Sequence, residues 1–460
     1  MRLMGGDKYP LDLGSNSHLT NMKNGFERTL IRRVAAISVT ALAAYALSSG
    51  SAYAQLTVPS VAAGEDGKET KEVEPLVEPP KPAKPPFDLY GWIEAGITGN
   101  PNAPADNHNF GHVFTDRANE PLLNQMSIVA ERVLDPNTTG FDWGFKTWFM
   151  YGSDSRYSKS LGLLDLATNA RVQPDFWEIS ASVRLPIPST DGLDLKIGKY
   201  QDPMTAEGGD PRGNIFYSHS YIFNFGHPGN ETGILATLHV NKYLDLYSGV
   251  NRGATDSIQD NNHSAAFEGG FGLHLLDGNF TVLGLTLDGP EDPHNNHDWR
   301  YLNDITTIWK VTKSFTSITD LNLVYDTLAN GKWGGGVAQY FSYAINDWLQ
   351  VGMRGEIWRD SAGFFVSQFR ANNDVIHFAR GDNLSRSFPF DPSNLSGGKT
   401  TYLELTWGLT IKPPMPKPFT GLLIRPEVRY DRALTDQFKP FSQNTSDHQV
   451  TLGLDVVMEF

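Results

Sequence analysis

A clear alternating pattern occurs in VTLGLDVVMEF, residues 450–460. One parity is apolar and carries Val450, Leu452, Leu454, Val456, Met458 and Phe460, whereas the other carries Thr451, Gly453, Asp455 and Glu459. Such alternation is typical of a β-strand whose two faces meet different surroundings. In a soluble sandwich the apolar face meets a core, and in a membrane barrel it meets lipid while the polar face meets water. This strand alone does not decide between the two classes.

The composition narrows the choice. No stretch after residue 50 offers the roughly 20 apolar residues that a spanning helix needs, which excludes a helical membrane protein. With 44 Gly and 12% aromatic residues, the chain suits many strands joined by tight turns. It has no Cys, which excludes disulfide frameworks, thiolate zinc sites and cysteine nucleophiles.

The amino-terminal region predicts export. Three arginines, Arg28, Arg32 and Arg33, precede the apolar run 34–47, and Ala52-Tyr53-Ala54 then forms a small-x-small cleavage box. We therefore expect residues 1–54 to be a signal peptide region that is cleaved after Ala54. An uncleaved anchor is the alternative, for which the run is short. Met22 would be a more ordinary start, so the role of residues 1–21 stays open.

Charge and proline content describe the next segment. Residues 1–54 carry six basic and three acidic side chains, so their removal changes the net charge from -14 to -17. An acidic exported protein is a poor candidate for binding nucleic acid. Residues 55–86 are rich in Pro and charge, and we expect a disordered periplasmic linker. The alternative is a docking segment for a partner.

From residue 87 to residue 460 the sequence predicts one all-β domain with sixteen strands. The expected strands are 87–98, 124–133, 141–152, 175–186, 192–201, 231–241, 243–252, 263–275, 279–288, 302–313, 315–326, 333–345, 347–359, 400–412, 420–432 and 446–460. Long connections alternate with short ones, except that the connection after Tyr325 is short where a long one is due. That rhythm is typical of an antiparallel outer-membrane β-barrel, with short periplasmic turns and long outer loops. A soluble sandwich or propeller is the alternative.

The strand faces support a water-filled interior. In residues 421–432 one parity places Arg425, Glu427, Arg429 and Asp431 on the same face, while the other parity is mostly apolar. Unpaired charges would cost several kcal/mol each in a packed core, but they are natural in water. Barrels of about 16 strands leave an aqueous channel. The aromatics Phe87, Tyr90 and Trp92 and the cluster at 143–151 fit either interfacial girdles or ordinary strand propensity.

Residues 193–241 carry a family resemblance. A strand ending in Gly198-Lys199-Tyr200 leads into a long loop with Glu207, then Ser218-His219-Ser220-Tyr221 and the strand start Thr232-Gly233. This pattern resembles the OmpL-like β-barrel porins of Gram-negative outer membranes. The resemblance implies a passive diffusion channel for small hydrophilic solutes and ions. It also implies contact with outer-membrane lipid and lipopolysaccharide, assembly by the barrel assembly machinery, and Phe460 as the assembly signal.

Porins of this kind often fold the loop after the fifth strand into the pore, here residues 202–230. The run FYSHSYIFNF is unusually apolar for a surface loop, which favours insertion over packing as an outer lid. Candidate pore-lining or constriction residues are Lys196, Asp202, Glu207, Asp210, Arg212, Arg354, Glu356, Arg425, Glu427 and Arg429. A constriction with Arg354, Arg425 and Arg429 opposite Asp202 and Glu207 is one expectation.

Two other function classes stay open, a barrel enzyme and a soluble exported binding protein. The sequence has no G-x-S-x-G elbow or H-E-x-x-H pair, so we predict no catalytic residue and no enzyme activity. The histidines of 108–112 and 293–298 suit solvated loops better than a metal site, and we predict no metal and no cofactor. The transported solute, the gating and the oligomeric state are not encoded in any motif, although sixteen-stranded porins often form trimers.

The count of charges on the expected interior parity predicts mild cation selectivity. On that parity we count sixteen acidic and seven basic side chains. The resulting cation preference should weaken in high salt, because the Debye length falls to about 3 Å at 1 M. A ring of basic side chains at the narrowest point would set the ion selectivity in place of the total interior charge.

The predicted processing is directly testable. If the signal region is removed after Ala54, amino-terminal sequencing of the mature protein should begin at Gln55. A mature chain that retains residues before Val34 would contradict this prediction.

Overall fold

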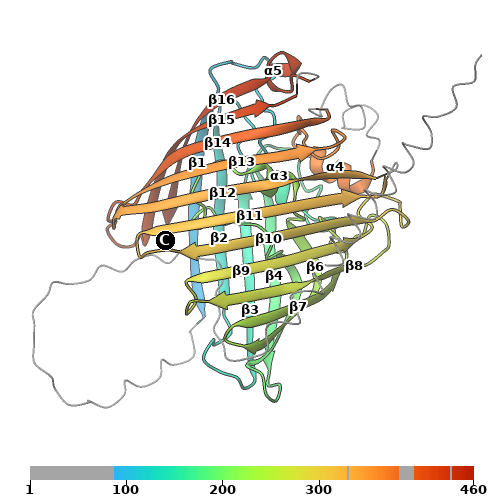
Figure 1. Ribbon diagram of the computed structural model, residues 1–460, viewed down its shortest axis with the longest axis vertical. Coiled ribbons are helices and arrows are strands. Elements are labelled where there is room, and N and C mark those ends of the chain that lie inside the picture. Colours follow the sequence, from blue (N-terminus) through green and yellow to red (C-terminus); the bar gives the residue numbers. More distant parts are fainter. Residues whose placement is uncertain (1–86, 329–330, 383–397, 436–437) are drawn as a thin grey trace, which may run out of the picture. The chain divides into compact units, whose positions relative to one another are not determined.

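The computed structural model describes residues 87–460 apart from 329–330, 383–397 and 436–437. The predicted signal region and linker lie outside the described residues. Sixteen antiparallel strands close into one barrel in which each strand pairs with its sequence neighbours and β1 pairs with β16 (Figure 1). Among the helices of the described residues, none is both long and apolar enough to span a membrane.

The strand bounds agree closely with the sequence prediction. The strands are β1 (Asp88–Gly99), β2 (Pro121–Arg132), β3 (Asp142–Gly152), β4 (Gln173–Leu185), β5 (Gly192–Gln201), β6 (Asn230–Asn241), β7 (Leu244–Asn251), β8 (Ala266–Leu275), β9 (Phe280–Gly289), β10 (Arg300–Lys310), β11 (Phe315–Asp326), β12 (Lys332–Asn346), β13 (Leu349–Asp360), β14 (Thr400–Ile411), β15 (Gly421–Ala433) and β16 (His448–Glu459). Within the described residues, the long loops contain four short helices: α2 (Ser155–Ser158), α3 (Tyr221–Phe225), α4 (Asp374–Arg380) and α5 (Phe441–Asn444). The expected alternation of long and short connections is present, including the short one at 327–331.

Exposed and buried side chains alternate along the strands, and this shows which face of the barrel wall points outward. Along β16 the side chains of Leu452 and Leu454 are exposed, while Thr451 and Asp455 are buried inside the barrel. Along β15, Arg425, Glu427 and Arg429 are likewise buried inside, and Val428 is exposed. The apolar parity therefore faces outward and the charged parity inward, as the sequence predicted.

The girdle interpretation was wrong for three aromatic residues. Trp92 and Trp148 are buried inside the barrel, where their rings meet at 5.0 Å, and Tyr90 shares the face of Trp92. Their parity is that of the inward charges, so strand propensity and interior packing explain them better than the membrane interface does. Trp143 and Tyr151 are exposed on the outward face, as girdle residues should be.

The barrel is closed at Phe460. The main-chain N–H of Phe460 donates to Gly91 O at 3.0 Å, and the N–H of Gly91 donates back to Phe460 O at 2.9 Å. A Cβ at Gly91 would lie 2.8 Å from the Phe460 ring, so this ring lies directly over the β1 backbone. Phe460 thus completes the seam between the first and last strands.

This seam gives a prediction for assembly. Phe460→Ala or deletion of Phe460 should lower the amount of folded barrel in the outer membrane more than Glu459→Gln does, because Glu459 lies on the inward parity and leaves the seam intact. Equal outer-membrane levels of the three variants would contradict the assigned role of Phe460.

Candidate channel constriction

The loop between β5 and β6, residues 202–229, lies inside the barrel, as the sequence favoured. Its main-chain N–H groups bond to carboxylates of the wall. Tyr217 N donates to Glu427 on β15 at 2.9 Å, and Tyr221 N donates to Glu356 on β13 at 2.6 Å. On the same stretch of wall, two strands from β13, Ala206 N donates to Asp320 on β11 at 2.9 Å. These bonds hold the loop across the interior.

Arginines of the wall bond to the carbonyl oxygens of the same loop. Arg354 on β13 donates to Ser218 O at 2.8 Å, and Arg425 on β15 donates to Pro211 O at 2.6 Å and to Asn214 O at 2.9 Å. Arg429 donates to His219 O at 2.5 Å. Acids and bases of the wall therefore satisfy the N–H and C=O groups that the loop buries.

Each of these arginines also has carboxylate partners. Arg354 binds Glu207 of the loop at 2.6 Å and Glu404 of β14 at 3.1 Å. Arg425 reaches Asp455 at 2.5 Å and Glu94 at 3.3 Å, and Arg429 reaches Asp431 at 2.7 Å. The three guanidinium groups are at most 1% exposed. Ionised groups tolerate such burial only when they are paired and hydrogen-bonded.

The remaining predicted site residues lie apart from this network. Asp202 Oδ2 lies 3.0 Å from His227 Nδ1, near the two ends of the loop. The prediction that Asp202 lies opposite Arg354, Arg425 and Arg429 was therefore wrong. Asp210 pairs with Arg212 at 2.6 Å within the loop, and the Arg212 guanidinium lies 4.2 Å from the Trp92 ring. Lys196 is paired with Glu178 at 3.5 Å.

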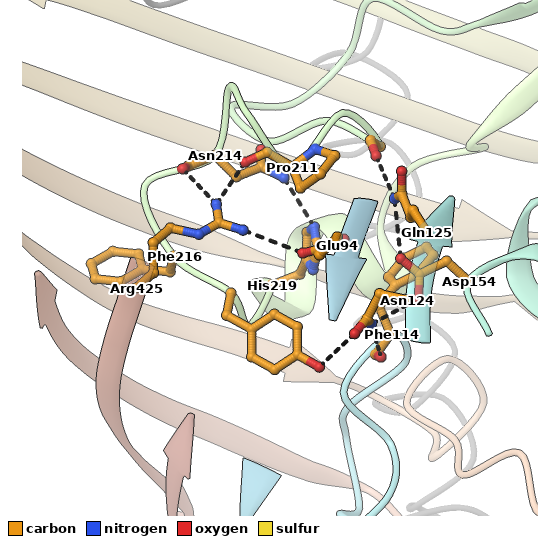
Figure 2. A pocket seen from close by; sticks show the side chains of 12 residues that line it. Glu94, Phe114, Asn124, Gln125, Asp154, Pro211, Asn214, Phe216, His219 and Arg425 are labelled. Carbon is orange, nitrogen blue, oxygen red and sulfur yellow. Dashed lines mark hydrogen bonds and ion pairs between the residues drawn. The ribbon is translucent and has the colours of Figure 1, made fainter. Parts of the chain in front are cut away.

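Two small hollows flank the loop segment 209–216, and Figure 2 shows one of them. The one in Figure 2 has room for about one water molecule and is lined by Glu94, Asn124, Gln125, Asp154, His219 and Arg425 among others. The other has similar room and is lined by Arg212, Gln350, Thr410 and Lys412 among others. Asn214 borders both, and its side chain closes the turn 208–214 by accepting from Gly208 N at 2.9 Å and donating to Gly208 O at 2.7 Å. Figure 2 shows how Arg425 ties this turn to the wall.

Electrostatics in the loop follow from burial and from Arg354. Burial alone would raise the pKa of Glu207, but the charge of Arg354 and the Ser220 donors outweigh burial and hold this pKa below its usual value. Burial lowers the pKa of His219 to about 4 and raises the pKa of Asp154 to about 6. His219 is therefore neutral at pH 7, and its ring stacks on Phe223 at 4.4 Å.

Sequence reasoning missed several partners. Glu94, Glu404 and Asp455 are among the sixteen interior acids of the sequence count. Their spacing in the sequence does not show which arginine each one binds. Asp304 was missed. The prediction that the histidines of 108–112 lie in a solvated loop was wrong, because His108 and His112 are buried. His112 of that loop lies 3.4 Å from Asp431, and its neighbour Phe110 accepts a hydrogen bond from Gln449 at 2.9 Å. The apolar character of HNFGHVF, residues 108–114, was the available signal.

In the described residues, no group of three or more His, Asp or Glu side chains is arranged to hold a metal ion.

The Glu207–Arg354 pair predicts an acid-dependent loss of stability. Because the folded-state pKa of Glu207 is lowered, its stabilisation is present above the usual value of 4.5 and is lost as the pH falls through the lowered value. Glu207→Gln should cost up to about 3–5 kcal/mol of unfolding free energy at pH 7 and less in that acid window. Urea unfolding at several pH values measures both, with Asp277→Asn on the exposed turn 276–279 as control. A constant difference between Glu207→Gln and the parent at all pH values would contradict the assignment.

Solved structures resemble the chain in fold, and a family model matches its sequence. Among solved structures, an anion-selective porin from Comamonas acidovorans aligns with TM-score 0.50 and 8% identity, covering 82% of this chain and 99% of that one. The outer membrane channel DcaP of Acinetobacter baumannii gives 0.49 and 9%, covering 81% and 97%, and Pseudomonas putida OprB gives 0.46 and 12%, covering 81% and 94%. No curated protein sequence matches the chain. A family model described as "Putative beta-barrel porin-2, OmpL-like" matches residues 86–460. The chain therefore belongs to the OmpL-like β-barrel porin-2 family of outer-membrane proteins.

Proposed function

We propose that the chain is a passive diffusion channel in which small hydrophilic solutes and ions pass the loop 202–229 inside a water-filled barrel. The observation that carries this proposal is a loop folded into a closed barrel whose residues 86–460 match the OmpL-like porin-2 family model. Solutes would pass beside segment 209–216, where the packing leaves a small hollow on each side. Conductance of the purified protein in a planar lipid bilayer tests the proposal, and a folded barrel without conductance would refute it.

The buried charged side chains bind the inserted loop, which favours a channel over an enzyme. Arg354, Glu356, Arg425, Glu427 and Arg429 all bind the main chain of the loop. Side chains engaged in this way hold a constriction in place and are not available to attack or protonate a substrate. We propose no catalytic residue and no cofactor.

The exposed interior charges, not the total, should set the ion preference. Most of the acids counted from sequence are buried and bonded, including Glu356, Glu404 and Asp431. Lysines remain accessible, because the side chains of Lys146 and Lys196 are 26% and 36% exposed while their shared partner Glu178 is 6% exposed. We therefore propose weak selectivity, with these two lysines opposing the cation preference that the wall count predicted.

Placement in the cell completes the proposal. We propose cleavage after Ala54 and a periplasmic linker at 55–86. The even strand number puts both ends of the barrel on the same side of the membrane, which supports periplasmic hairpin turns and long outer loops. Lipid and lipopolysaccharide would contact the outward face, and the barrel assembly machinery would insert the chain. Nucleic acid is not expected as a partner.

The lysine pair gives a testable prediction. Lys146→Gln with Lys196→Gln leaves Glu178 without its basic partners, so the reversal potential in a low-salt gradient should shift towards cation selectivity. The shift should shrink in 1 M salt, where the Debye length is about 3 Å. Lys313→Gln on the exposed hairpin turn 311–314 serves as control. A shift towards anions, or an equal shift in the control, would refute the role of the lysines.

A further inference from the structure

The second of the two hollows beside segment 209–216 is basic. Apart from Asn214, which closes the turn 208–214, its lining carries four side chains that can donate hydrogen bonds to a ligand: Arg212, Gln350, Thr410 and Lys412. Two of the four are cations, and none of the lining residues that the structure describes is acidic. The hollow in Figure 2, by contrast, is lined by the acids Glu94 and Asp154 among others. We call the four donors of the second hollow the basic pocket.

The basic pocket lies at the end of the barrel that carries the short turns 347–348 and 412–420. Gln350 is the second residue of β13, and Lys412 directly follows the end of β14. The inserted loop brings Arg212 to the same end, where its guanidinium carbon lies 4.9 Å from the centre of the Tyr90 ring near the start of β1. The Arg212 side chain is 23% exposed. Solutes in the water at this end can therefore reach the pocket.

Lys412 contributes a charge that no acid neutralises by contact. Within the part of the chain that the structure describes, its ammonium group makes no ion pair and no hydrogen bond. Burial lowers the pKa of this group, the carboxylate of Glu459 partly offsets the lowering from a distance, and the charge of Arg425 adds to it. An anion beside Lys412 would supply the missing partner.

Asp210 does not use all of the Arg212 donors. The Nε and Nη2 atoms of Arg212 donate to Asp210 at 2.9 and 2.6 Å, which fixes the orientation of the guanidinium group. The Nη1 atom is 3.9 Å from Glu459, which is too far for a hydrogen bond. The pocket therefore combines an oriented guanidinium group with an unpaired ammonium group.

The size of the pocket limits what can enter it. The hollow has room for about one water molecule, so it can receive an oxygen atom of a solute but not a whole solute. Guanidinium, ammonium and amide groups together favour an oxyanion, because they place several N–H donors around a charged oxygen. The remainder of such a solute would stay in the water at the short-turn end.

We propose that the basic pocket binds the carboxylate or phosphate end group of small anionic solutes. Arg212 and Lys412 supply the charge. The Gln350 amide, which makes no hydrogen bond to another described residue, supplies a further donor. The pocket adjoins segment 209–216, so an anion held there lies beside the proposed path. Its role in transport therefore rests on the proposed function, whereas the binding itself does not.

A phosphorus NMR titration of inorganic phosphate with the purified, folded barrel in detergent tests the site. We expect saturable binding at pH 7 and low salt. Lys412→Gln should weaken this binding about tenfold, because a charge-assisted hydrogen bond is lost, and Lys412→Arg should retain most of it. Lys417→Gln removes the same charge from an exposed position in the same turn, so this matched control should leave the affinity unchanged.

Glu459→Gln should change the affinity in the opposite direction. Glu459 lies close to both Arg212 and Lys412 without lining the pocket, so it competes with a bound anion for their charge. Removal of this carboxylate should tighten phosphate binding severalfold.

Four outcomes in a folded barrel would overturn the proposal: no saturable phosphate binding by the parent, equal affinities of the parent and Lys412→Gln, an equal loss in Lys417→Gln, or weaker binding by Glu459→Gln. Conductance is a separate measurement. A barrel that binds phosphate with the expected pattern but does not conduct would refute the channel and keep the site. A conducting barrel without phosphate binding would do the reverse.

Discussion

The structure depends on buried ion pairs and hydrogen bonds between the wall and the main chain of one loop. A loop inside a barrel carries N–H and C=O groups that would cost several kcal/mol each if they were left without partners. The inward carboxylates accept from the N–H groups and the inward arginines donate to the C=O groups. Each charged group then also needs a counter-charge, which explains why Glu404, Asp455 and Asp431 lie beside the arginines. The charges of the wall therefore serve first to hold the loop and only then to influence solutes.

The barrel and the loop support each other. Strand alternation brings charged side chains to the interior, and the loop prevents those charges from facing one another unpaired. Arg354 shows this dependence, because its partners come from the loop, through Glu207 and Ser218, and from β14, through Glu404. Around segment 209–216 the packing is loose enough to leave a hollow on each side, and this is the place where passage is proposed.

Much of the architecture could be predicted because alternation is local information. The ladder at 450–460 and the charged parity of 421–432 each report the two faces of a strand, and the bounds of β5 and β11 were predicted without error. Long-range pairing could not be predicted in the same way. Asp202 was placed near the arginines from its position in the loop, yet the chain turns so that it meets His227. For Trp92 and Trp148 the girdle and strand-propensity interpretations were both left open, although the parity of these residues already placed them inside. The role of several charges depended on loop partners more than a hundred residues away, such as Tyr217 for Glu427 and Glu207 for Arg354.

The central claim is that the inserted loop limits passage through the barrel. The most direct test is the single-channel conductance of a variant in which the closed turn 208–214 is replaced by two glycines while the anchors at Ser218, Tyr221 and Ile222 are kept. The account predicts a folded barrel with a larger unitary conductance, because the shortened segment no longer separates the two hollows. A folded variant with the conductance of the parent would show that the loop does not control the opening.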